Sequence, residues 1–276
     1  MQVPVGEFRF DVEVSGPEDG EPVLLLHGFP QNRHSWDAIV PELNRAGLRT
    51  IAPDQRGYSP GARPAGADSY ALPLLGADAV GVLDALGVES AHVVGHDWGA
   101  VVAWYLAAEN PSRVRTLTAM SMPHLEAYWW ALRNDPVQRQ LSQYIAFFTD
   151  EASTAALLAD DAAMLRSLFG PSVAQDQVER YLALHTQPGV LDATLNWYRS
   201  GSLLDSSERL GMVSAPTTLI SSDWDRAASR KAVEKAGDHV SGPYRLVTLE
   251  GVSHWQPEEA PERITAEILE RVGGRA

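Results

Sequence analysis

The chain has no cysteine among its 276 residues. Disulfide bridges, thiolate catalysis and cysteine-ligated metal sites are therefore excluded. It also lacks an apolar run long enough to cross a bilayer. The first ten residues, MQVPVGEFRF, have neither a basic start nor a continuous apolar stretch. We therefore expect no signal peptide, no contact with a membrane and a cytoplasmic location.

Positive charge is scarce. The sequence has 22 Lys and Arg against 36 Asp and Glu, for a formal net charge of −14. This balance argues against nucleic acid or an anionic membrane as a partner. The 45% hydrophobic and 21% charged residues are ordinary for a soluble globular protein. We expect a monomer or a homodimer with one large domain or two small ones.

Strands and helices alternate through residue 122. Segment 8–14 alternates apolar and polar residues, which predicts an edge strand, whereas 23–26 is continuously apolar and predicts a strand buried on both faces. The alternation predicts parallel β-α units in a doubly wound sheet. The predicted strands are 8–14, 23–26, 49–52, 92–94, 114–120, 216–221 and 244–249, and the predicted helices are 32–46, 70–86, 100–108 and two that begin near residues 227 and 257.

The alternation stops between residues 124 and 208. This segment is rich in Ala, Leu and aromatic residues at helical spacing and shows no clear strand. We interpret it as a helical cap inserted into a core domain formed by 1–123 and 209–276. The cap would lie over the carboxyl ends of the strands, where open α/β sheets bind their ligands.

The segment from 91 to 105 reads as a strand, a tight turn and a buried helix. Gly95 and Gly99 let the backbone bend sharply around Asp97, whose carboxylate would lie near the positive end of the new helix. The pattern G-x-D-x-G resembles a nucleophile elbow with aspartate in place of serine. Taken alone, it fits equally well a glycine-flanked turn with a helix-capping Asp97.

A nucleophile elbow needs an acid and a histidine after later strands, in the chain order nucleophile, acid, histidine. Both occur here in that order. Asp223 and Asp225 come after the strand at 216–221, and His254 comes after the strand at 244–249. A histidine in a glycine-containing loop is hard to explain as core packing. Either aspartate could be the acid, or it could cap the next helix.

The loop His27-Gly28-Phe29-Pro30 follows a central strand. In α/β sheets that carry a nucleophile elbow, the oxyanion hole lies at this position. The expected donors are the backbone N–H groups of Phe29 and Trp98. We interpret the His27 ring as a buried, hydrogen-bonded support of this loop.

Four segments carry a resemblance that covers nearly the whole chain. GHDWGAVVAWYLAAENPSRV, HGFP, DQRGYSP and GVSHWQPEEAPE resemble the α/β-hydrolase superfamily and, within it, soluble epoxide hydrolases with an aspartate nucleophile. The resemblance implies an α/β fold with a mostly parallel, doubly wound sheet and a helical cap inserted after the sixth strand. It also implies Asp225 as the acid, since the family's acid ends a four-residue run after its strand. Ser221-Ser222 stands where relatives often have glycine.

The resemblance extends to the cap. Epoxide hydrolases place two cap tyrosines over the nucleophile, and the segments LNWYR and SQYIAFF are similar to those that carry them. This implies Tyr198 and, by a looser match, Tyr144. Each could instead be an amphipathic aromatic that fills the cap interface. The aromatic side chains that we expect to bind substrate are Trp129, Phe147, Phe148 and Trp255.

An ionised aspartate can attack an sp³ carbon without a base. The resemblance implies an epoxide hydrolase that forms an alkyl ester on Asp97, hydrolyses it with water activated by His254, and uses a small apolar epoxide and water but no cofactor or metal. A haloalkane dehalogenase with the same triad is an alternative. Trp98 could offer it an N–H donor, whereas the Phe29 side chain offers none. A ligand-binding protein on the same fold is the other alternative.

Overall fold

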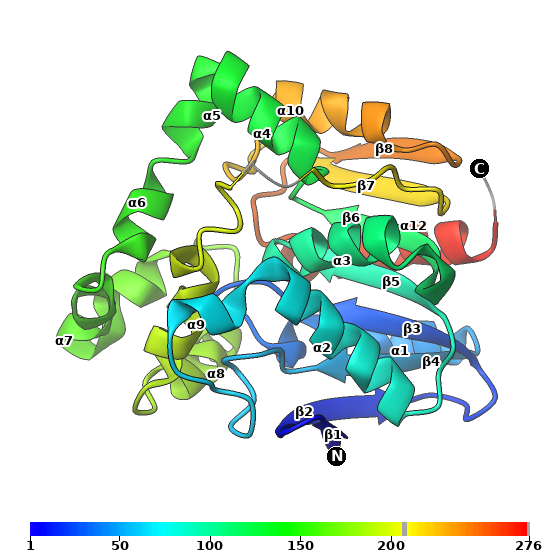
Figure 1. Cartoon of the computed structure of the whole chain (residues 1–276), viewed down its shortest axis with the longest axis horizontal. Helices are drawn as coiled ribbons and strands as arrows, with labels where there is room; N and C mark the ends of the chain where they lie inside the picture. The colour runs from blue at the N-terminus through cyan, green and yellow to red at the C-terminus, as the bar shows by residue number, and fades with distance from the viewer. Residues whose placement is uncertain (206–208, 275–276) are drawn as a thin grey trace.

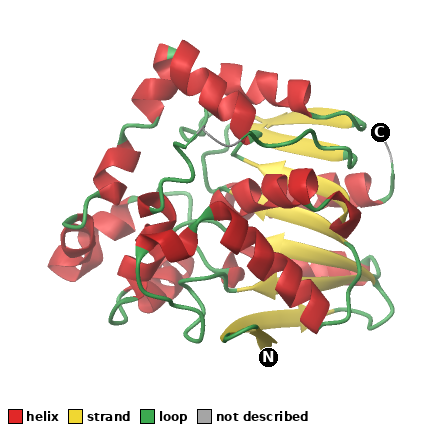
Figure 2. Cartoon of the chain, viewed as in Figure 1, coloured by secondary structure: helices red, strands yellow, loops and turns green. Residues whose placement is uncertain are grey.

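The computed structural model describes residues 1–205 and 209–274, in which an eight-stranded sheet carries helices on both faces (Figures 1 and 2). The strands are β1 (Gln2–Val5), β2 (Phe8–Ser15), β3 (Glu21–Leu26), β4 (Leu48–Pro53), β5 (Ala91–His96), β6 (Val114–Met120), β7 (Thr217–Ser222) and β8 (Tyr244–Leu249). The α-helices are α1 (Val40–Arg45), α2 (Leu72–Ala85), α3 (Trp98–Glu109), α4 (Leu125–Asn134), α5 (Pro136–Leu141), α6 (Tyr144–Thr149), α7 (Ser153–Ser167), α8 (Gln175–His185), α9 (Val190–Arg199), α10 (Arg230–Lys235), α11 (Gln256–Glu259) and α12 (Pro261–Val272). Short 3-10 helices are η1 (Arg33–Trp36), η2 (Ala67–Tyr70), η3 (Pro111–Arg113) and η4 (Ala236–His239).

The strand order is β1-β2-β4-β3-β5-β6-β7-β8. The β1–β2 and β2–β4 pairs are antiparallel and the remaining pairs are parallel. The chain places β4 on one side of β3 and then crosses to place β5 on the other, so the order reverses between β3 and β5. Open α/β sheets bind ligands beyond the carboxyl ends of strands at such a reversal. The expected doubly wound, mostly parallel sheet is confirmed.

Side-chain alternation along β3 divides the core into two layers. Val23 and Leu25 pack in the layer that holds α1 and α12, whereas Leu24 and Leu26 pack in the layer that holds α2 and α3. Successive residues of a strand point to opposite faces, so a strand covered on both sides must be apolar at every position. All four residues are fully buried.

Helices α4–α9 follow β6 and gather at one end of the sheet (Figure 1). Residues 124–205 contain helices and loops and no strand. The interval thus has the helical content expected of the inserted segment. Residues 206–208 at the end of the predicted cap, and 275–276 at the end of the predicted core, lie outside the described residues.

Several element boundaries differ from those predicted. Segment 8–14 is not an edge strand, because the unpredicted β1 pairs with it on one side and β4 on the other. The predicted helix 32–46 divides into η1 and α1, and the predicted closing helix divides into α11 and α12. Pro41 and Pro261 explain both breaks, since proline has no N–H to continue a helix but fits the first turn of a new one.

Candidate active site

Residues 95–99 form a sharp elbow between β5 and α3. Asp97 has φ 53° and ψ −121°, a backbone conformation that costs a non-glycine residue about 1–3 kcal/mol. A Cβ on Gly99 would overlap the carbonyl oxygen of Leu26, and one on Gly95 would overlap the backbone of Gly99. Glycine at both positions lets α3 pass this close to the sheet. The elbow therefore presents Asp97 beyond the carboxyl end of β5.

The Asp97 carboxylate does not cap α3. Its Oδ1 accepts a hydrogen bond from the backbone N–H of Phe29 at 2.8 Å, and the N–H of Trp98 also bonds the carboxylate. A Cβ on Gly28 would overlap this carboxylate, so glycine there allows the close approach. Burial raises the pKa of the Asp97 carboxyl above its ordinary value, against the opposing effects of His254 and the two N–H groups.

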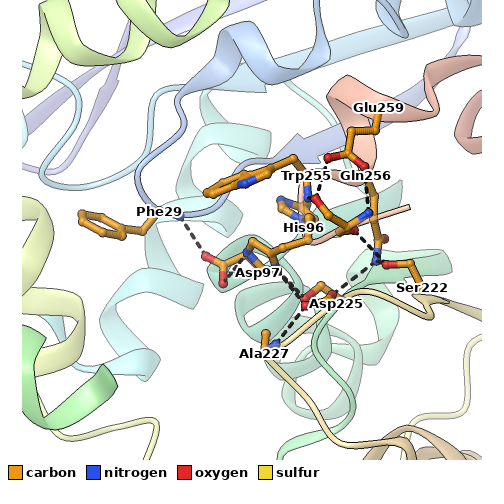
Figure 3. A network of polar contacts seen from close by, with 12 residues as sticks. Phe29, His96, Asp97, Ser222, Asp225, Ala227, Trp255, Gln256 and Glu259 are labelled. Carbon is orange, nitrogen blue, oxygen red and sulfur yellow. Dashed lines mark hydrogen bonds and ion pairs between the residues drawn. The ribbon is translucent and has the colours of Figure 1, made fainter. Parts of the chain in front are cut away.

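His254 lies between two carboxylates. Its Nδ1 is 3.0 Å from Oδ1 of Asp225, and its Nε2 is 3.6 Å from Oδ2 of Asp97. Figure 3 shows Asp97 and Asp225 in this network, with the N–H of Ala227 donating to Asp225 at 2.9 Å. Burial by itself lowers the pKa of His254, but the charges of Asp225 and Asp97 outweigh it and raise that pKa to about 9.

The structure separates the two candidate acids. For Asp225, burial raises the pKa, yet the contact with His254 and the hydrogen bonds hold it at about 2. Asp223 is exposed, and its Oδ1 accepts the N–H of Gly251 at 2.8 Å. Asp223 therefore ties two loops together, whereas Asp225 is the aspartate that faces the imidazole.

Ser121 is a neighbour of His254 that the sequence did not point to. Its Oγ lies 3.1 Å from Nδ1 of His254, so it shares this nitrogen with Asp225. Ser121 follows β6 with φ 70°, and the N–H of Met122 bonds the carbonyl of Met120 across it. This tight turn is strained for a residue with a side chain. Only the position of Ser121 directly after a strand could have suggested it.

A pocket of about 430 Å³ opens onto Asp97 and His254. The core side contributes Phe29 and Trp255, while α6 and α9 contribute aromatic side chains from across the opening. The predicted site residues that line the pocket are Asp97, His254, Phe29, Tyr144, Phe148, Tyr198 and Trp255. Asp225 and Trp98 complete the group through their bonds to His254 and Asp97.

Contacts with the core hold Tyr198 over the site. The indole N–H of the preceding residue, Trp197, donates to the carbonyl of Arg56 at 2.8 Å. Arg56 is fixed in turn by a buried two-point ion pair with Asp78, at 2.6 and 2.7 Å. Burial and the charge of Asp97 raise the pKa of Tyr198 well above its ordinary range. Burial does the same for Tyr144, so both hydroxyls keep their protons at neutral pH.

Two predicted substrate-binding residues do not line this pocket, and we correct them. The indole N–H of Trp129 donates to the carbonyl of Leu203 at 2.9 Å, and its ring lines a separate pocket of about 310 Å³. Phe147 is 38% exposed and lies outside the lining. It precedes Phe148 by one residue, which is about 100° of helix rotation, so the two rings point in different directions and it is Phe148 that lines the pocket.

Within residues 1–205 and 209–274, no group of three or more His, Asp or Glu side chains is placed to hold a metal ion. No helix in the described part of the chain is both long and apolar enough to span a membrane.

Comparison with known proteins gives consistent matches. The model of a family described as alpha/beta hydrolase fold matches residues 21–261. The chain is 36% identical to the AB hydrolase superfamily protein YfhM of Bacillus subtilis, over 94% of this chain and 92% of that protein. It is 32% identical to epoxide hydrolase A of Mycobacterium tuberculosis, over 95% of this chain and 93% of that protein. The crystal structure of epoxide hydrolase A from Mycobacterium thermoresistibile superposes with a TM-score of 0.87 at 27% identity, covering 99% of this chain and 98% of that chain.

These matches cover at least 94% of the chain, so the similarity includes the helices between β6 and β7. The predicted resemblance and the predicted hydrolase class are confirmed. The chain belongs to the α/β-hydrolase family, and it is similar in sequence and structure to the epoxide hydrolases of that family.

Proposed function

We propose that this protein hydrolyses epoxides to vicinal diols through a covalent ester on Asp97. The observation that supports this most directly is the pairing of a buried carboxylate with two protonated tyrosines across one pocket. The carboxylate can attack an epoxide carbon, and a tyrosine hydroxyl can protonate the ring oxygen. We also propose that residues 124–208 act as the cap that supplies these tyrosines.

In the first step Oδ2 of Asp97 attacks one ring carbon. Oδ1 is already held by the N–H of Phe29, which leaves Oδ2 toward His254 and the pocket. The carbon–oxygen bond of the ring breaks as the ester bond forms, and the ring oxygen takes a proton from Tyr144 or Tyr198. The result is an alkyl ester, an alcohol and a tyrosinate.

The charge of Asp97 keeps His254 protonated until the ester has formed, so the second step can only follow the first. In the resting protein His254 has a pKa of about 9, so it is an imidazolium at neutral pH. Ester formation removes the charge of Asp97, which is one of the groups that raise this pKa. The pKa of His254 then falls, and its proton can pass to the tyrosinate. His254 becomes a base only once there is an ester to hydrolyse.

In the second step neutral His254 takes a proton from a water that attacks the ester carbonyl. The N–H groups of Phe29 and Trp98, which already bond the Asp97 carboxyl, would stabilise the oxyanion. Collapse releases the diol and restores the Asp97 carboxylate beside an imidazolium. Because His254 must be neutral here, this step slows as pH falls through its pKa in the ester state.

The pocket favours a small apolar epoxide. Its volume of about 430 Å³ lies in the range of small-molecule sites, and Phe148, Leu168 and Trp255 give it apolar walls. Water is the second substrate, and the scheme requires no cofactor.

Dehalogenation remains the second candidate because of one observation. The indole nitrogen of Trp98 is buried, and it could exchange its interaction with the Tyr198 side chain for a bond to a halide. A leaving halide needs more than one donor, and Phe29 offers only carbon from its side chain. The two tyrosines favour the epoxide.

Replacing His254 with Gln provides the test. The first step needs no base, so the variant should accumulate the ester when mixed with an epoxide. Intact-protein mass should rise by one whole epoxide, located on the peptide that carries Asp97. His34→Gln is the matched control, because His34 also pairs with a carboxylate, that of Asp37 at 3.1 Å, but in a solvent-exposed contact.

The outcomes separate the candidate functions. Adducts from haloalkanes alone, equal to the alkyl group without halogen, would establish dehalogenation. The absence of any adduct, together with no turnover of a broad epoxide panel by the unmodified protein, would favour the ligand-binding alternative. An adduct in an Asp97→Ala, His254→Gln double variant would show that the nucleophile lies elsewhere.

A further inference from the structure

One buried carboxyl group near the site has no part in the proposed reaction. Glu258 lies on α11, four residues after His254. Its Oε1 accepts hydrogen bonds from the Tyr181 hydroxyl at 2.6 Å and from Nε2 of Gln31 at 2.7 Å. Its Oε2 is buried without a partner among the residues that the structure describes. A buried carboxylate oxygen without a partner is costly, which favours a proton on this group.

Glu258 begins a buried relay that ends on His254. Gln31 connects Glu258 to His96, with its Oε1 2.9 Å from Nδ1 of the imidazole. Nε2 of His96 lies 2.8 Å from the backbone carbonyl oxygen of His254. The relay therefore reaches the main chain of the residue that serves as base in the proposed reaction.

The hydrogen bonds of this relay can all form only if it carries one extra proton. The carbonyl oxygen of His254 is an acceptor, so His96 must donate from Nε2. If His96 is neutral, its Nδ1 is then an acceptor and must receive the amide N–H of Gln31. The amide oxygen of Gln31 then faces Glu258, which can bond it only as a protonated carboxyl.

The other orientation of the Gln31 amide requires the same number of protons. With its oxygen turned to His96, that ring faces two acceptors and must be an imidazolium, while Glu258 is a carboxylate. Burial lowers the pKa of His96 to about 3 and raises that of Glu258 to about 7. These directions favour the arrangement with neutral His96 and protonated Glu258.

We propose that Glu258 and His96 hold one shared proton across Gln31, and that Glu258 is thereby a positioning residue for His254. With the proton, every contact of the relay pairs a donor with an acceptor. Without it, two acceptors face each other at one contact, and the backbone of His254 is held less firmly. The relay is complete below the pKa of Glu258 and loses one hydrogen bond as pH rises through it.

The surroundings of the relay include other titratable groups. His254 as an imidazolium lowers the pKa of Glu258, in opposition to burial. Tyr181 stays protonated because burial raises its pKa far above the ordinary value. The remaining groups that act on the relay are Asp37 beyond Tyr181, and Asp225 and His27 around His96.

Spectroscopy tests the shared proton without relying on the reaction. The infrared difference between the unmodified protein and Glu258→Gln should show a protonated-carboxyl band that disappears as pH rises through about 7. Nitrogen NMR should show a neutral His96 that is protonated on Nε2. An ionised Glu258 beside a doubly protonated His96 would be the other arrangement of the shared proton, and it would also support the proposal. An ionised Glu258 beside a singly protonated His96 below neutral pH would overturn the proposal.

Single-turnover hydrolysis of the Asp97 ester tests the positioning role and rests on the proposed function. Glu258→Gln supplies a permanent N–H donor, so its ester hydrolysis should lack the alkaline decline expected of the unmodified protein. Glu258→Ala removes the end of the relay and should slow hydrolysis about tenfold at every pH. Glu262→Gln, the same substitution at an exposed position on α12, is the control. Identical pH profiles for Glu258→Gln and the unmodified protein would contradict the positioning role.

Discussion

The two walls of the pocket are held by different forces. Hydrogen bonds and charge fix the floor, which we define as Asp97, Asp225 and His254, and each of these side chains makes at least two polar contacts. Packed rings fix the roof, which we define as Tyr144, Phe148 and Tyr198. The ring centroid of Phe148 lies 5.0 Å from that of Tyr198 and 5.5 Å from that of Tyr144, and both pairs pack edge to face.

The difference extends to the polar atoms. On the floor, the donors and acceptors are already paired and aimed before a substrate arrives, which is the arrangement that stabilises charge at a fixed place. On the roof, the hydroxyl of Tyr144 makes no hydrogen bond to any described residue, so it stays available for a ligand oxygen. A floor of this kind suits ester chemistry, and a roof of this kind suits a substrate whose oxygen needs a proton.

The largest expected effect comes from breaking the floor at Asp225. Asp225→Asn removes the charge that holds the His254 imidazole, and we expect ester hydrolysis to slow by about 10³–10⁴-fold. The first step should survive, so rapid mixing with an epoxide should give a burst of ester followed by little turnover. The pKa of His254, measured by NMR in the resting variant, should fall from about 9 because the main group that raises it is gone.

Asp223→Asn is the matched control, two residues away on the same loop. It removes the charge of Asp223 but keeps an oxygen that can accept the N–H of Gly251, and it leaves Asp225 in place, so its ester hydrolysis should stay within a few-fold of normal. If Asp223→Asn proved as damaging as Asp225→Asn, the acid would be misassigned.

Local rules narrow the floor in the sequence, and the resemblance completes it. Asp97 sits in a five-residue turn whose two glycines favour an elbow, and His254 and the pair Asp223 and Asp225 follow strands in a set order. Only the resemblance to epoxide hydrolases selects Asp225 from that pair. The doubly wound sheet likewise follows from short apolar runs between helical segments. Strand β1 was missed because Gln2–Val5 is short and contains Pro4, and it gains its pairing only from β2.

The rest of the site depends on which side of an element faces inward. Phe147 and Phe148 are equivalent in sequence, and only the packing of α6 against α9 brings Phe148 to the pocket. Ser121 and Glu258 were missed for a similar reason. Glu258 and Glu259 are adjacent acidic residues, and nothing local shows that one is bonded to Tyr181 from α8. Such pairings join segments far apart in the chain.

An intermediate effect is expected from the roof. Tyr198→Phe and Tyr144→Phe each remove a proton donor, and we expect each to slow ester formation by about 10²-fold, with a larger loss in the double variant. Ester hydrolysis should change little, because the proposed mechanism assigns that step to the floor. Rapid mixing in the His254→Gln background isolates the first step.

Tyr70→Phe is the control for the roof variants, since the buried Tyr70 hydroxyl bonds the carbonyl of Pro64 and lines no part of the pocket. Normal ester formation in both single roof variants would remove the tyrosines from the mechanism and erase the contrast between roof and floor.

The smallest effect tests whether strain at Ser121 contributes to the floor. Ser121→Ala and Ser121→Gly both remove the Oγ that contacts His254, so both should slow ester hydrolysis about tenfold.

The two variants should differ in stability, because φ at residue 121 is 70° and glycine adopts such a conformation without the penalty that alanine retains. After allowance for the greater freedom of glycine in the unfolded chain, we expect Ser121→Gly to have the larger free energy of unfolding, by about 0.5–1 kcal/mol in urea titrations. Equal stabilities would mean that the turn relaxes without the serine, and full activity in either variant would show that Asp225 alone orients the imidazole.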